Sequence, residues 1–126
     1  MIYISIDGDD IGRKITSCYL SNDRNGLAEL SQSLKISTKA ISIKLQEYGF
    51  DIIFCAADGV VASTELDIDL KWLFSEIRRS FPEGMTFSAG CGINLREAYI
   101  ALTSAKSNGK NCLHEYSALD DATKDN

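Results

Sequence analysis

The chain has 126 residues, of which 44% are hydrophobic, and its formal net charge at pH 7 is −5. This length fits one globular domain, which we place at residues 1–116, followed by a polar C-terminal tail at residues 117–126. The acidic balance argues against a long nucleic acid as ligand, because binding its backbone needs a clustered basic surface. A small anion that arrives with its own metal ion stays compatible with this charge.

Nothing in the sequence predicts insertion into a membrane. No apolar run approaches the ~20 residues needed to cross a bilayer, and the first residues lack the basic start and cleavage site of a signal peptide. We therefore expect a cytoplasmic protein. The four cysteines lie far apart without CxxC spacing, which favours buried thiols over a zinc or redox site.

The first predicted strand alternates Ile2, Ile4 and Ile6 with polar residues, the period of a half-buried β-strand. It runs directly into an acidic turn, Asp7–Asp10. Several carboxylates at one strand end repel each other unless they share a cation. The sequence therefore predicts a metal site at this turn.

Two helices are predicted after the acidic turn. In the first, Ile11, Ile15 and Cys18 share one face, and a polar turn at residues 21–26 ends it. The second, residues 27–49, carries apolar side chains at three- and four-residue steps. This spacing indicates a helix that packs one face on the core.

A hairpin of two apolar strands follows, at residues 50–57 and 59–62, with Asp58 at the turn. A fourth carboxylate is thus available at a strand end. Next, Thr64 and Asp67 have the spacing of a capping box, which predicts the start of a third helix that ends before the only proline.

The fourth predicted strand, residues 85–94, contains two glycines, and Asn94 precedes the last helix. We expect the strand to point Phe87, Ala89, Cys91 and Ile93 inward, and the helix to bury Leu95, Ala98, Tyr99, Leu102 and Ala105. Residues 112–116 predict a short edge strand.

This order of strands and helices, with one crossover in each half and a hairpin in the middle, indicates an α+β protein with a ferredoxin-like, split βαβ plan. We expect an antiparallel sheet with helices on one face and the first strand in the centre. Asp7 and Asp58 would then face each other across neighbouring strands.

Four motifs carry a family resemblance: Asp7–Gly12, Ala56–Gly59, Phe87–Gly92 and Ala105–Asn111. They occur in the order found in GGDEF diguanylate cyclases, and they look closer still to the Palm domain of the polymerase subunit of type III CRISPR complexes. A free-standing single Palm of this size resembles the minimal CRISPR polymerase family, mCpol. The resemblance reaches to about residue 116, and the last motif, AKxxGKN, is its most specific part.

The resemblance implies nucleotidyl transfer assisted by two Mg²⁺ or Mn²⁺ ions, with Asp7 and Asp58 as the catalytic acids. It implies metal binding by Asp7, Gly8, Asp9 and Asp58. It implies nucleotide binding by Gly8, Asp10, Ile11, Gly12, Ala56, Ala57, Lys106 and Lys110, the two lysines on the β- and γ-phosphates. The hairpin departs from the family, because only one acid is present and two alanines replace two glycines; Asp10 is the candidate to replace the missing acid.

The function so implied is the joining of nucleoside triphosphates into a cyclic di- or oligonucleotide, with release of pyrophosphate, for antiviral signalling through a separate effector. Diguanylate cyclases read guanine with an Asn and an Asp, and the matching positions here are Ile15 and Arg24, so we expect ATP as substrate. Ring closure needs two hydroxyl attacks, which predicts a homodimer or higher homo-oligomer.

Each feature also has a simpler interpretation. Asp9 or Asp10 would serve as a helix N-cap, Asp58 as an ordinary turn residue, and the two lysines as charges at a helix C-terminus. The alternative function is a catalytically degenerate Palm domain that binds nucleotides or cyclic dinucleotides as a sensor, which Gly59 favours because it stands where the family has a second acid.

Overall fold

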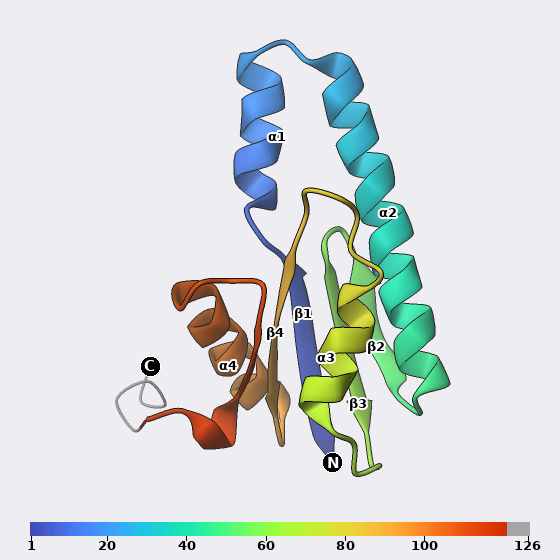
Figure 1. Cartoon of the computed structure of the whole chain (residues 1–126), viewed down its shortest axis with the longest axis vertical. Helices are drawn as coiled ribbons and strands as arrows, with labels where there is room; N and C mark the ends of the chain where they lie inside the picture. The colour runs from blue at the N-terminus through green and yellow to red at the C-terminus, as the bar shows by residue number, and fades with distance from the viewer. Residues whose placement is uncertain (121–126) are drawn as a thin grey trace.

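A computed structural model describes residues 1–120 and contains a five-stranded sheet in the order β2-β3-β1-β4-β5 (Figure 1). All neighbouring pairs are antiparallel except β4 and β5, which are parallel. The elements are β1 (Ile2–Gly8), α1 (Ile11–Leu20), α2 (Arg24–Glu47), β2 (Asp51–Ala56), β3 (Gly59–Thr64), α3 (Leu70–Arg78), β4 (Phe87–Gly92), α4 (Leu95–Ser107), β5 (Leu113–Glu115) and a 3-10 turn, η1 (Tyr116–Ala118). The α+β, ferredoxin-like Palm architecture is thus confirmed, with β1 at its centre.

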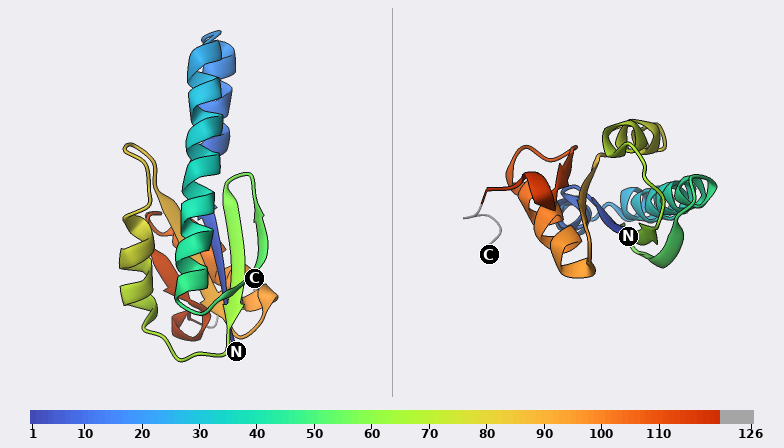
Figure 2. Two further views of the ribbon diagram at one scale, coloured as in Figure 1. Left: turned by 90° about the vertical axis from the view of Figure 1, so that its right-hand side faces the viewer. Right: turned by 90° about the horizontal axis from the view of Figure 1, so that it is seen from below.

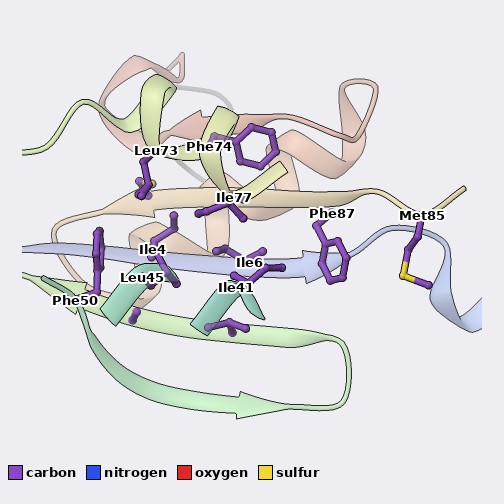
Figure 3. Close-up of a cluster of buried hydrophobic side chains, with 14 of the residues drawn as sticks. Ile4, Ile6, Ile41, Leu45, Phe50, Leu73, Phe74, Ile77, Met85 and Phe87 are labelled. Carbon is purple, nitrogen blue, oxygen red and sulfur yellow. The ribbon is translucent and has the colours of Figure 1, made fainter. Parts of the chain in front are cut away.

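The main hydrophobic core lies between the sheet and the helices α2 and α3. Ile4 and Ile6 of β1 are fully buried there, as the alternation in the first strand predicts. Figure 3 shows them between side chains of α2 and α3, including Ile41 and Ile77. This packing holds β1 rigidly, so that the acidic turn at its end has a fixed position.

The fourth helix covers the opposite face of the sheet, so the expectation of helices on one face was wrong (Figures 1 and 2). The reason lies in the glycines of β4. A side chain at Gly90 would collide with the backbone of α4 at Ala98 and Leu102. The missing side chain lets α4 approach the sheet closely, with Ala98, Ala101 and Ala105 buried in the contact.

Some local expectations also need correction. Ile93, Leu95 and Tyr99 are exposed and do not join the core. The third helix is capped by Asp69, whose side chain accepts from the backbone N–H of Trp72, and the predicted capping box does not form. The predicted edge strand is present as β5, although its parallel pairing with β4 departs from a purely antiparallel sheet.

The helices α1 and α2 form a hairpin whose far end extends beyond the sheet (Figure 2). Among residues 1–120, no helix combines the length and the apolarity that a membrane-spanning segment needs. The predicted polar tail begins within η1, and its residues 121–126 lie outside the part of the chain that the structure describes.

Candidate functional site

The acidic turn and the hairpin turn meet at one edge of the sheet. Asp7 pairs with Gly59 across β1 and β3, and the backbone N–H of Gly8 donates to the carbonyl of Asp58 over 2.9 Å. A side chain at Gly8 would lie too close to Ile11 and to Cβ of Asp58, so only glycine permits this approach. Asp7 and Asp58 therefore occupy neighbouring strand ends, as the sequence predicts.

The hairpin turn itself contains a strained residue. Ala57 adopts a left-handed backbone conformation with φ of 53°, at a position where glycine has no steric penalty. The turn directs Asp58 toward β1, where its carboxylate contributes to the electrostatics of Asp7. The strain is therefore located at the residue that precedes a candidate catalytic acid.

Asp7 sits in an environment that resists its ionisation. Burial raises the pKa of the Asp7 carboxyl, the Lys106 ammonium opposes this effect, and the neighbouring carboxylate of Asp58 adds to the increase. Two carboxylates at such short range gain most from a shared cation.

Lys106, on the last turn of α4, reaches into this acidic cluster. Its Nζ donates to the carbonyl oxygen of Gly8 over 2.8 Å, and it forms ion pairs with Asp7 Oδ2 at 3.1 Å and Asp9 Oδ1 at 3.5 Å. The helix can place this lysine above β1 only because it packs on the glycines of β4.

Asp9 is the buried centre of the site, with only 3% of its surface exposed. Its Oδ1 accepts from the hydroxyl of Ser88, and its Oδ2 accepts from the hydroxyl of Thr86 and from the backbone N–H of Asn111, over 2.7, 2.7 and 3.0 Å. Asp9 therefore joins the acidic turn to β4 and to the loop after α4. As a metal ligand it stays a prediction, and both of its oxygens already have donors.

Sequence reasoning missed Thr86, Ser88 and Asn111. Thr86 and Ser88 lie 77 and 79 residues from Asp9 along the chain, so no local spacing connects them. The one available signal was the pair of hydroxyl residues at alternate positions near the start of an otherwise apolar strand.

Asp10 lies at the N-terminal end of α1 in a left-handed conformation, but its side chain makes no capping hydrogen bond. The capping interpretation of this carboxylate is therefore wrong. Its partner is the ammonium of Lys110, and the hydrogen bond with that ammonium lowers the pKa of the Asp10 carboxyl. Lys110 thus lies beside the acidic turn, close to where Lys106 also reaches.

The remaining predicted nucleotide-binding residues lie in two places. Gly12 is exposed on the first turn of α1, whereas Ile11 is buried beneath Gly8. Ala56 and Ala57 border a groove of about 380 Å³ between the hairpin turn and α2. The groove is lined by Ser31, Leu34, Lys35, Thr38, Lys39, Cys55, Ala56 and Ala57.

The oxygen atoms at this turn are donors of the kind that could hold magnesium or manganese. Within residues 1–120, no three His, Cys, Asp or Glu side chains are arranged so that they could hold a metal ion by themselves. Magnesium in nucleotide enzymes usually takes one or two carboxylates and completes its shell with phosphates and water. Asp7, Asp58 and the carbonyl of Gly8 are hard oxygen donors of this kind, and the Lys106 ammonium already demonstrates that a cation is accommodated among two of them.

The fold and this site together define a Palm-like domain, with paired carboxylates at the ends of β1 and the hairpin and lysines supplied from α4 and its following loop. Residues 3–116 match the family described as mCpol, minimal CRISPR polymerase domain. The chain belongs to this family, and it is accordingly a CRISPR-associated polymerase or nucleotidyltransferase-like domain. No curated protein matches the sequence.

Proposed function

We propose that this protein joins nucleoside triphosphates, with ATP as the favoured substrate, into a cyclic di- or oligonucleotide and releases pyrophosphate. The observation that carries the proposal is the convergence of Asp7 and Asp58 with the ammonium of Lys106 at one edge of the sheet. Carboxylates hold divalent cations, and ammonium groups bind the phosphates that those cations bridge.

Asp7, Asp58 and the carbonyl of Gly8 would hold Mg²⁺ or Mn²⁺. When bound, such ions lower the pKa of an attacking ribose hydroxyl and offset the charge of departing pyrophosphate. Lys106 and Lys110 would bind the β- and γ-phosphates, each through a charge-assisted hydrogen bond. Asp9 would keep the loop that carries Lys110 in place through its contact to Asn111.

The groove beside Ala56 and Ala57 is the proposed location of the nucleoside, because Ala57 directly precedes Asp58 in the hairpin turn. Guanine presents two adjacent N–H donor groups that need acceptors, whereas adenine presents one, and no acidic or amide side chain is among the described residues that line this groove. This absence supports adenine over guanine.

We also propose that the protein works as a homodimer or higher homo-oligomer and that a separate effector reads its product. Closing a ring of two nucleotides requires two transfer reactions, and residues 1–120 of one chain offer one pair of candidate catalytic acids. Two chains whose sites face each other would supply both. The membership of a CRISPR polymerase family is the support for the proposed antiviral role.

A second candidate function is a sensor that binds nucleotides without turnover. Gly59 favours it, because a side chain there would point at Asp7, with its Cβ 3.4 Å from Oδ1. A second acid at this position would thus join the metal site, and the chain lacks it. Asp10 is paired with Lys110, which leaves its proposed role as a replacement to be tested.

Mass analysis of the products after incubation with ATP, GTP, CTP and UTP and either Mg²⁺ or Mn²⁺ separates these functions. The enzyme releases pyrophosphate and forms a cyclic product, and Asp7→Asn and Asp58→Asn each abolish both while the circular dichroism spectrum stays native. A sensor forms no product, and ligand only raises its melting temperature. The corresponding stabilisation is about 2.7 kcal/mol when the ligand concentration is a hundred times Kd. Turnover that survives in both variants refutes the assignment of the two acids.

A further inference from the structure

The ammonium of Lys106 occupies a position that is surrounded by oxygen atoms. Its contacts are the Gly8 carbonyl at 2.8 Å, Asp7 Oδ2 at 3.1 Å and Asp9 Oδ1 at 3.5 Å. The first two of these belong to the set that the proposed function assigns to a divalent cation. One positive charge therefore already lies against the oxygens that a metal ion would need.

The lysine is tethered firmly at one end and free to move at the other. Its backbone is part of α4, next to the buried Ala105, where the helix packs closely on the sheet. Its side chain is 28% exposed and consists of flexible methylene groups. The ammonium can therefore leave the carboxylates without any change in the fold.

We propose that Lys106 is an exchangeable internal cation that neutralises the acidic cluster in the nucleotide-free protein and competes with divalent metal for it. This inference rests on the proposed metal site at Asp7 and Asp58. When a metal arrives with its triphosphate, the ammonium moves from the carboxylate to the phosphates, so the same residue serves both states. A metal ion that binds alone must displace the Lys106 ammonium from the carboxylates. A metal ion that binds with its nucleotide brings phosphates with which the displaced ammonium can pair.

The competition has a physical basis in the charges around Lys106. Asp7 and Asp58 lie at neighbouring strand ends, and the buried carboxylate of Asp9 contacts the same ammonium as Asp7. Without a cation, this cluster carries unbalanced negative charge at short range. Removing the ammonium therefore exposes the cluster to metal ions and at the same time destabilises the metal-free fold.

Lys110 provides a matched control. It is also a lysine beside the acidic turn, and its partner is Asp10 instead of Asp7, Gly8 or Asp9. Lys110→Met removes the same charge from the same region without vacating the contact with Gly8. Lys106→Arg is a second control, since it retains the positive charge.

The test measures Mn²⁺ binding to the full chain by electron paramagnetic resonance, with no nucleotide present. We expect Lys106→Met to bind Mn²⁺ about tenfold more tightly or better, a difference of about 1.4 kcal/mol. Lys110→Met and Lys106→Arg should stay close to the wild-type affinity. Lys106→Gln, which keeps a donor for the Gly8 carbonyl, carries the same test if the Met variant does not fold.

Thermal unfolding gives an independent readout. Lys106→Met should melt at a lower temperature than the wild type without metal, and Mn²⁺ should recover most of the loss while shifting the wild type less. Equal Mn²⁺ affinities in Lys106→Met and the wild type, or weaker binding by the variant, overturn the proposal. A wild type without nucleotide turnover that still shows these shifts refutes only the proposed enzymatic function, so the two failures are distinguishable.

Discussion

The backbone N–H of Asn111 donates to Oδ2 of Asp9 over 3.0 Å, and this contact fastens the loop after α4 to the turn after β1. The two residues lie 102 positions apart in the chain. The same carboxylate accepts from Thr86 and Ser88, so one buried acid joins three separate segments. The loop that carries Lys110 thus depends on Asp9 for its position.

Asp9→Ala should therefore destabilise the protein strongly. The substitution leaves the hydroxyls of Thr86 and Ser88 and the N–H of Asn111 without their acceptor inside the fold. We expect the free energy of unfolding to fall by roughly 2–4 kcal/mol, measured by urea denaturation. Asp10→Ala, which removes a partly exposed carboxylate paired with Lys110 in the same turn, should cost clearly less. A loss under about 1 kcal/mol for Asp9→Ala contradicts the anchoring role.

Asp7→Asn should stabilise the metal-free protein at neutral pH. Because the pKa of Asp7 is raised in the folded state, chiefly by burial, its ionisation weakens the fold as pH rises through that pKa. The Asn variant avoids this effect, and its advantage should disappear as pH falls below 3.8, the ordinary pKa of an aspartate carboxyl, where Asp7 becomes protonated in both states. Melting temperatures between pH 3 and pH 8 in the presence of a chelator test the sign.

Asp10→Asn serves as the control for that experiment, with the opposite sign. Lys110 lowers the pKa of Asp10, so its ionised form stabilises the fold above the unfolded pKa and this contribution is lost as pH falls. The Asn variant should be less stable than the wild type at neutral pH and equal to it in acid. Parallel pH profiles for the two variants would show that the assigned causes are wrong.

Ala57→Gly should stabilise the hairpin turn. Ala57 has a φ of 53°, and a left-handed backbone costs a residue with a side chain about 1–2 kcal/mol. Glycine removes this cost, but its greater conformational freedom in the unfolded chain offsets part of the gain. We expect a net gain of about 0.5–1 kcal/mol by urea denaturation. Ala56→Gly, one residue earlier in β2, should instead destabilise by about 0.5–1 kcal/mol.

Gly59→Asp tests whether the missing second acid limits metal binding. A side chain at Gly59 fits beside Asp7 at ordinary contact distance. The metal-free variant should lose roughly 0.2–1 kcal/mol of stability, because like charges then oppose each other across the strands. Its Mn²⁺ affinity should rise about tenfold. Gly59→Asn controls for size, and an equal rise in that variant would exclude a charge effect.

Lys110→Ala should weaken the use of triphosphate. A charge-assisted contact to phosphate contributes about 1.5–3 kcal/mol, so kcat/KM for ATP should fall about tenfold or more. Lys110→Arg should keep much of the activity, since it preserves the charge. Unchanged kcat/KM in the alanine variant would show that Lys110 does not bind the triphosphate and serves only in its ion pair with Asp10.

The sequence by itself determined the order of elements, the burial of Ile4 and Ile6, and the meeting of the Asp7 and Asp58 turns. These features follow from local periodicity, from turn residues and from the chirality and pairing rules of a split βαβ plan. The motif order also sufficed to indicate the family that residues 3–116 match.

Only the tertiary structure decided which face of the sheet α4 covers and what Asp9 contacts. Periodicity reveals that a helix has an apolar stripe but not which surface it packs on. Here α4 packs on the face of β4 where Gly90 has no side chain, because a Cβ there would collide with the helix backbone. Tyr99 was misplaced for the same reason, because a helix packed through small residues leaves its large ones outside. The partners of Asp9 come from β4 and from the loop after α4, and contacts between segments so far apart depend on strand register, which sequence spacing does not encode.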